Sequence, residues 1–174
     1  MRTAKLGAIM TATAILSACS SGGGSPAVPA ASTSAIASMS AASYVDLAAS
    51  AALYAVEAAK LAETRARDRD IRDLARLQGQ AGTAIGGQLA FAGPRVNAVP
   101  DNVLTAEHQA MLDALRTASD FDDLYLEQQK RLVPQMRELH ENYAVIGGSA
   151  TLRPVAEFGA GKMAAQAEAV KRAD

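Results

Sequence analysis

SYVDLAASAALYAVEAAKLAETRAR, residues 43–67, is the stretch that decides the fold class of this chain of 174 residues. Its apolar residues recur at three- and four-residue steps, the repeat of an α-helix with one buried face. Ser43 precedes the run and Asp46 follows three residues later, a spacing typical of a helix N-cap. Small side chains would let a neighbouring helix approach closely on the predicted face, which consists of Val45, Ala49, Ala52, Val56 and Ala59.

The chain beyond this stretch repeats the helical pattern, and no segment alternates apolar and polar residues convincingly as a strand does. Further helices are predicted over residues 70–92, 106–118, 120–146 and 151–172, with Thr105 as the N-cap of the short one. Their core-facing stripes include Gln78, Gln128 and Gln166 among apolar residues. We therefore predict an all-α fold, an antiparallel four-helix bundle with a short extra helix in the middle crossover.

Two features of these helices have local consequences. Each glycine within the second predicted helix costs about 1 kcal/mol relative to alanine, so the glycines either weaken the helix or permit tight contact with the first one. A phosphate-binding loop is excluded because no strand precedes the glycines and no Gly-Lys-Ser/Thr follows them. Pro134 should remove one hydrogen bond and kink its helix. The glycines are Gly79, Gly82, Gly86 and Gly87.

Composition excludes several classes of protein. The formal net charge is −1, from 17 Lys and Arg against 18 Asp and Glu, so the chain is not a strongly basic nucleic-acid binder. Hydrophobic residues make up 49%, which excludes a disordered polar chain over most of the length. A single cysteine, Cys19, excludes a disulfide within the chain.

The first nineteen residues have the pattern of a processing signal. Arg2 and Lys5 precede the apolar run LGAIMTATAIL, which is too short to span a bilayer as a helix of about 20 residues. The run ends in Leu16-Ser17-Ala18-Cys19, which resembles the lipobox of bacterial lipoproteins. The resemblance implies that residues 1–18 are a lipoprotein signal peptide and that Cys19 is lipidated. The alternative is an ordinary cleaved signal with an incidental cysteine.

Residues 19–42 are predicted to form a flexible, uncharged tether ahead of a bundle domain at residues 43–174. About twenty such residues span on the order of 25 Å as a coil. Several acyl chains on Cys19 would anchor the protein stably, so a membrane is the expected partner. By analogy with lipoproteins, Ser20 in place of Asp after the cysteine favours the periplasmic face of the outer membrane.

Three segments of the helical part carry a resemblance to a known family: residues 44–75, 104–129 and 139–158. Their most specific pieces are EAAKLAETRA, AEHQAMLDAL and FDDLYLEQQ. They resemble a bacterial exported family known only as domain of unknown function 4142. The resemblance covers nearly all of residues 43–174 and implies a ferritin-like four-helix fold.

Histidines that the resemblance implies in relatives are missing here. An Asp-His pair of the second helix falls at Ala81-Gly82, and a histidine after the Tyr-x-x-x-Gln segment falls at Val133. A Leu-Pro…His pattern near the end falls at Gly161 and Gln166. These departures weaken the case for any metal or proton chemistry that the family performs.

The residues themselves also argue against a di-iron centre. Such a site in a ferritin-like bundle needs Glu-x-x-His on two helices and a glutamate on each of the others, and this chain has no Glu-x-x-His. We expect His140 to lie at the edge of the core, hydrogen-bonded to a partner, and His108 to face solvent. No catalytic residue, metal ligand or cofactor is predicted.

Two charged clusters admit both a structural and a functional interpretation. The arginines interleave with aspartates and lack aromatic neighbours, which favours a salt-bridged helix junction over an anion or nucleic-acid site. The acidic cluster begins a predicted helix, where the helix dipole already favours carboxylates. The clusters are Arg65, Arg67, Arg69, Arg72 and Arg76, and Asp120, Asp122, Asp123 and Glu127.

We therefore expect a non-enzymatic lipoprotein that acts as a binding or structural module of the envelope. The alternative is a ferritin-like metal-binding or redox protein that uses carboxylates such as Glu57, Glu63, Glu138 and Glu141. A third hypothesis is an apolar ligand held between the first two helices. The sequence names neither a protein partner nor a ligand.

Overall fold

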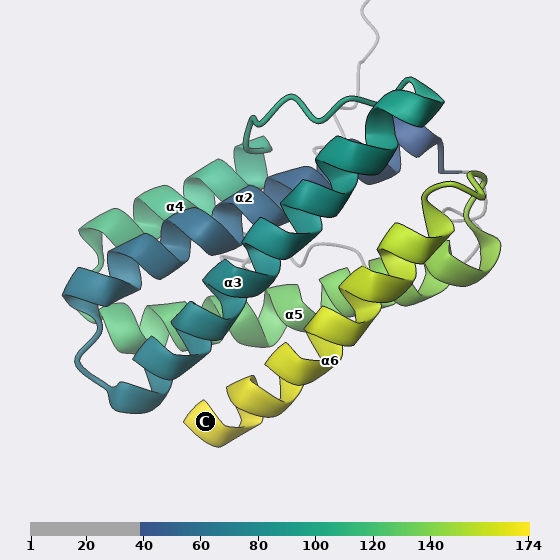
Figure 1. Ribbon diagram of the computed structural model, residues 1–174. Coiled ribbons are helices and arrows are strands. Elements are labelled where there is room, and N and C mark those ends of the chain that lie inside the picture. Colours follow the sequence, from purple (N-terminus) through teal and green to yellow (C-terminus); the bar gives the residue numbers. More distant parts are fainter. Residues whose placement is uncertain (1–38) are drawn as a thin grey trace, which may run out of the picture.

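The computed structural model describes residues 39–174, and in this range the protein consists of helices and loops without strands. Figure 1 shows the long helices lying side by side, with a shorter one along the flank of the bundle. The predicted signal peptide, Cys19 and nearly all of the predicted tether lie outside the described residues. The prediction of an all-helical bundle is confirmed for the part described.

Helices α2 (Ala41–Arg65) and α3 (Arg69–Ala92) form an antiparallel pair joined by a short turn. The prediction that Ser43 caps the first helix is wrong. Ser40 is the N-cap, and its side chain accepts a hydrogen bond from the Ser43 backbone N–H. Ser and Asp near a helix start compete for this role, and the chain enters the helix one turn earlier than the apolar pattern indicates. Asp68 caps α3.

Close backbone contact holds α2 against α3. A Cβ added to Gly82 would lie 2.5 Å from the carbonyl oxygen of Ala52, and one added to Gly79 would lie 2.9 Å from the Ala59 Cβ. The equivalent atoms at Gly86 and Gly87 would meet nothing within 4 Å. Tight contact is therefore the role of the first two glycines only.

The connection from α3 to α5 runs the length of the bundle. It contains the 3₁₀ helix η1 (Gly93–Val96), a loop, and helix α4 (Ala106–Thr117). The N-cap of α4 is Thr105, as predicted, and its backbone N–H donates to Ser50 Oγ in the first half of α2. At the other end of α4, the Arg65 guanidinium donates to the carbonyl of Leu115. Helix α4 therefore runs parallel to α2 along its flank.

Helices α5 (Phe121–Ile146) and α6 (Arg153–Ala173) form the second antiparallel pair. Helix α5 begins beside the α2–α3 turn, where the Asp122 carboxylate accepts hydrogen bonds from the Arg67 and Asp68 backbone N–H groups. It therefore runs parallel to α3 and antiparallel to α2. It continues as one helix past Pro134, which lies at an exposed position.

Alanine and tyrosine make the core unusual. Many of the buried side chains of α2 are alanines, whereas Tyr44, Tyr54, Tyr125 and Tyr143 are fully buried between the helices. The small side chains allow the helices to approach closely, and the four phenol rings fill the remaining volume. No helix within residues 39–174 is both long and apolar enough to cross a membrane.

Candidate functional site

A layer of polar side chains crosses the centre of the bundle, and every long helix contributes to it. The side chains are buried, yet none carries a charge. Helix α5 contributes three of them because positions 125, 128 and 129 lie on one face, at steps of three and four residues. The layer consists of Tyr54 from α2, Gln78 from α3, Tyr125, Gln128 and Gln129 from α5, and Gln166 from α6.

Hydrogen bonds join Gln78 to three other members of the layer. The Tyr125 hydroxyl donates to Gln78 Oε1 at 2.6 Å. Gln78 Nε2 donates to Gln129 Oε1 at 2.8 Å and to Gln166 Oε1 at 3.3 Å. Gln78 is therefore the hub that ties α3 to both α5 and α6.

The chain of hydrogen bonds continues through Tyr54 to the crossover helix. Gln129 Nε2 donates to the Tyr54 hydroxyl at 3.3 Å, and that hydroxyl donates to Gln128 Oε1 at 2.5 Å. Gln128 Nε2 in turn donates to the Met111 carbonyl of α4 at 3.0 Å. Burial raises the pKa of the Tyr54 and Tyr125 phenols well above their usual range, so both remain protonated donors.

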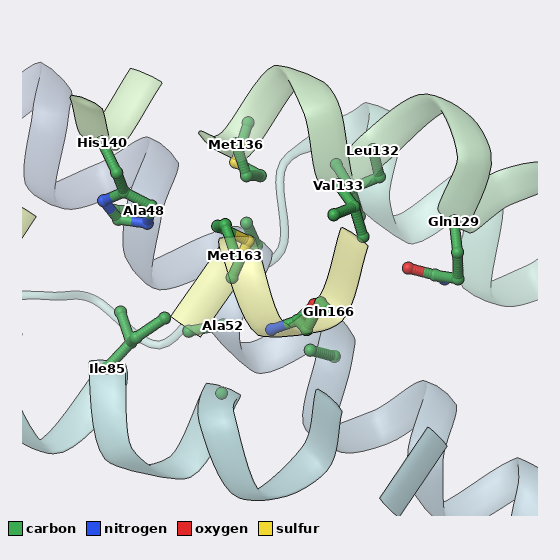
Figure 2. A pocket seen from close by; sticks show the side chains of 13 residues that line it. Ala48, Ala52, Ile85, Gln129, Leu132, Val133, Met136, His140, Met163 and Gln166 are labelled. Carbon is green, nitrogen blue, oxygen red and sulfur yellow. The ribbon is translucent and has the colours of Figure 1, made fainter. Parts of the chain in front are cut away.

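One donor of this layer has no protein partner. Gln166 Nε2 is buried without a hydrogen bond, although Gln166 Oε1 is engaged. Gln166 lines a cavity of about 20 Å³ between α2, α3, α5 and α6, the space that one water molecule needs. Figure 2 shows Gln166 and Gln129 at one side of this cavity and His140 at the other, with Met136 and Met163 between them. A buried water bonded to Gln166 would satisfy the free donor.

The predicted departures from the family pattern converge on this cavity. Gly82, Val133 and Gln166 all line it, although they lie on three different helices. Gly161 does not line it, and a Cβ there would meet nothing within 4 Å. Apolar or amide groups therefore occupy the bundle centre at the positions where the resemblance implies histidines in relatives.

His140 lies at the edge of the same cavity, and the prediction that it is hydrogen-bonded to a partner is confirmed. Its Nδ1 lies 3.0 Å from the Tyr44 hydroxyl, and its ring packs on Gly159. Tyr44 stacks on Tyr143 with ring centroids 3.9 Å apart. Burial lowers the pKa of His140 to about 4, so the imidazole is neutral near pH 7.

The prediction that His108 faces solvent is wrong. Only 2% of it is exposed, and its Nδ1 lies 2.7 Å from Ser50 Oγ. Helix α4 lies on the flank of α2 and buries one face there, which also contains Leu112 and Leu115. Burial lowers the pKa of His108 to about 4. The histidine is therefore a neutral packing group stacked on Tyr54.

The carboxylates named for a metal site do not come together. Glu57 pairs with Lys60, and Glu141 pairs with Arg137, each within its own helix. Glu63 and Glu141 are exposed, and Glu138 is only partly buried. Within residues 39–174, no group of three His, Cys, Asp or Glu side chains is placed to hold a metal ion.

The two charged clusters serve the end of the bundle at the α2–α3 turn. The Arg65 guanidinium donates to the carbonyls of Arg116 and Ala118 as well as to that of Leu115. These hydrogen bonds satisfy carbonyl groups at the C-terminal end of α4. Arg76 pairs with Asp73, as predicted for a salt-bridged junction. Asp122 binds the α2–α3 turn rather than capping its own helix. The N-cap residue Asp120 makes no side-chain capping bond.

Sequence reasoning placed Gln78, Gln128 and Gln166 on the core-facing stripes but did not predict that they meet. The available signal was the same on three helices: one glutamine interrupts an apolar stripe in each. A carboxamide in such a position needs a partner, because a buried polar group without a hydrogen bond is costly. Gln129 lies beside the stripe and gave no signal of its own.

Fold and layer together define a helical bundle closed around a neutral, hydrogen-bonded centre. The chain belongs to the family described as Domain of unknown function (DUF4142), whose model matches residues 25–173. The resemblance read from the three sequence segments is thereby confirmed. Comparison with curated proteins and comparison with solved structures each found no match to this chain.

Proposed function

We propose that the protein is a lipid-anchored envelope protein, held through Cys19 at the periplasmic face of the outer membrane, and that its bundle is a non-enzymatic binding or structural module. The lipobox-like sequence that ends at Cys19 supports the anchor. The bundle would then be carried on the tether of residues 19–42.

The order and direction of the helices support a ferritin-like arrangement within this proposal. Two antiparallel pairs, α2 with α3 and α5 with α6, are joined by one long crossover that contains η1 and α4. The crossover returns the chain along the bundle, so α3 and α5 run parallel. One long crossover of this kind is a property of ferritin-like bundles.

The neutral polar layer is the observation that carries the non-enzymatic part of the proposal. Metal sites in ferritin-like bundles are built from inward-facing glutamates and histidines on the four helices. Here the inward-facing groups at the centre are carboxamides and phenols that already bind one another. Carboxamides have no charge to stabilise a cation, so this donor set fits a structural role better than the metal-binding alternative.

The anchor is tested by labelling with palmitate in a Gram-negative host. We expect label on the full chain and on a Ser21→Ala control, and none on Cys19→Ser, because only a cysteine forms the thioether. The labelled protein should sediment with outer-membrane vesicles. An unlabelled chain that is released in the soluble periplasmic fraction contradicts the anchor.

The non-enzymatic interpretation is tested by metal analysis of the full protein, purified without chelators. We expect less than stoichiometric iron, manganese and zinc. One metal ion per chain, lost in Gln78→Leu but kept in the surface control Gln80→Leu, would overturn this interpretation in favour of a metal-binding or redox protein.

A further inference from the structure

Phe158 of α6 is 36% exposed, and four other large apolar side chains are exposed to a greater extent. Their exposed fractions are 65% for Phe91, 65% for Val99, 60% for Val103 and 73% for Val145. Phe91 lies at the end of α3, Val99 and Val103 in the loop after η1, and Val145 at the end of α5. Such side chains raise the free energy of the protein in water unless another surface covers them.

The ends of α3 and α5 lie with η1 at the end of the bundle at which α2 begins, called here the proximal end, and the loop after η1 leads from it to the start of α4 beside Ser50 (Figure 1). The 3₁₀ helix η1 contacts α2, and Gly93 packs against the Ala98 carbonyl. The α5–α6 loop lies next to the start of the described chain, since a Cβ on Gly148 would be 3.9 Å from the Met39 carbonyl oxygen.

Charge separates the two ends of the bundle. Residues 77–94 and residues 142–152 contain no charged side chain. The charges nearest the proximal end are Arg95, Asp101 and Arg153, and Asp46, Glu141 and Glu157 lie about one turn further into their helices. The opposite end, at the α2–α3 turn, contains the interleaved arginines and aspartates together with the acidic start of α5. A weakly charged end with exposed valines and a phenylalanine is chemically suited to a lipid surface.

The proximal end is the end of the bundle at which the chain arrives from Cys19. Met39 is the first described residue, it packs partly against the core, and twenty positions separate it from Cys19. A coil of that length spans on the order of 25 Å, so an acylated Cys19 would keep this end within reach of the headgroups. Tethering raises the effective concentration of lipid at this end, so a weak apolar contact suffices.

We propose that the proximal end lies on the membrane, with Phe91, Val99 and Val145 inserted at the boundary between headgroups and acyl chains. This inference rests on the proposed lipid anchor and adds an orientation to it. The guanidinium of Arg95 lies 3.8 Å from the centroid of the Phe91 ring. The ring would enter the lipid while the cation stays among anionic headgroups.

Tryptophan fluorescence tests this orientation cleanly, because the chain contains no Trp. The full, acylated chain is reconstituted into phosphatidylethanolamine–phosphatidylglycerol vesicles as Phe91→Trp, with Lys171→Trp as the control at the opposite end. We expect the emission of Trp at position 91 to shift to shorter wavelength and to be quenched by lipids with brominated acyl chains. The control should keep the emission of a water-exposed tryptophan.

Each result decides between alternatives. Equal, unquenched emission from both variants overturns membrane docking. A blue shift of Phe91→Trp without vesicles that grows with protein concentration also overturns it, and indicates that a second copy of the chain covers this end. Circular dichroism of both variants shows that the bundle is folded.

Failure of the anchor is distinguished by the mass of the mature N-terminus. If Cys19 carries no acyl chains, the proposed anchor is wrong, and vesicles are added to the unacylated Phe91→Trp chain instead. A blue shift of the unacylated chain on adding vesicles supports docking of the proximal end without an anchor. If the emission does not shift, the docking proposal is overturned together with the anchor. In the Cys19→Ser chain, Phe91→Ser should lower partitioning into vesicles about tenfold and Lys171→Ser should leave it unchanged.

Discussion

Replacement of Gly82 by alanine tests whether close packing of α2 on α3 determines the stability of the bundle. The added Cβ would lie 2.5 Å from the Ala52 carbonyl oxygen and 3.2 Å from the Ala55 Cβ. A Cβ and a non-bonded oxygen need a separation of at least about 3.0 Å. The two helices must therefore move apart by about 0.5 Å where Gly82 contacts Ala52. The obstructing atom belongs to backbone, which cannot rotate away.

Two opposing contributions determine how much Gly82→Ala changes the free energy of unfolding. Overpacking costs about 1–3 kcal/mol, and here the upper part of that range applies because backbone must move. Alanine in place of glycine within a helix contributes about 1 kcal/mol in the opposite direction. We therefore expect Gly82→Ala to lower the free energy of unfolding by about 1–2 kcal/mol.

Gly86→Ala is the matched control, one turn further along the same helix. Its Cβ would meet nothing within 4 Å, so only the propensity gain applies and the free energy of unfolding should rise by about 1 kcal/mol. Urea unfolding followed by circular dichroism should separate the two variants by about 2–3 kcal/mol, or on the order of 10 °C in Tm. Equal stabilisation of both variants would refute the packing argument.

Three further predictions concern the buried polar groups. Gln78→Leu should destabilise the bundle by about 2–4 kcal/mol, because Tyr125 and Gln129 each lose a buried partner, whereas Gln80→Leu on the exposed face should change stability by less than about 0.5 kcal/mol in the same urea experiment. Ser50→Ala should lower the free energy of unfolding by about 1–2 kcal/mol and increase amide hydrogen exchange in α4. The reason is that the Thr105 N–H loses its acceptor and His108 Nδ1 loses its hydrogen-bond partner. Unchanged exchange in α4 contradicts the proposed role of Ser50 in docking this helix. Stability should also depend on pH: burial lowers the pKa of His108 and His140 to about 4, whereas an unfolded histidine titrates near about 6.5. The unfolded chain then binds more protons between these values, so the stabilisation is fully present above about pH 6.5 and declines towards pH 4; a flat profile of unfolding free energy across this window contradicts the burial of neutral imidazoles.

Several features of the fold could be predicted from the sequence because they depend on local physics. The helical repeat of apolar residues and the Thr105 cap each act within a few residues. Such signals identified the number and order of the helices and the short helix in the crossover. They failed at Ser43 by one turn because Ser40 also offers a capping oxygen.

The environment of a side chain on a short helix could not be predicted in the same way. His108 was expected in solvent, but the docking of α4 on α2 buries it against Ser50 and Tyr54. Which face of a twelve-residue helix becomes buried depends on the loop that delivers it and on contacts such as Arg65 with Leu115. Those partners are 50 or more residues apart in the chain.

By itself, the sequence determined an all-helical chain of defined helix order, because helix formation and termination depend on neighbouring residues. The tertiary structure alone decided that four glutamines from α3, α5 and α6 meet two tyrosines at the bundle centre. It also decided that the carboxylates named for a metal site remain apart. The same packing leaves the free Gln166 donor beside a small cavity. Hydrogen bonds between helices require a common level along the bundle axis, and only the packing of all four helices sets that level.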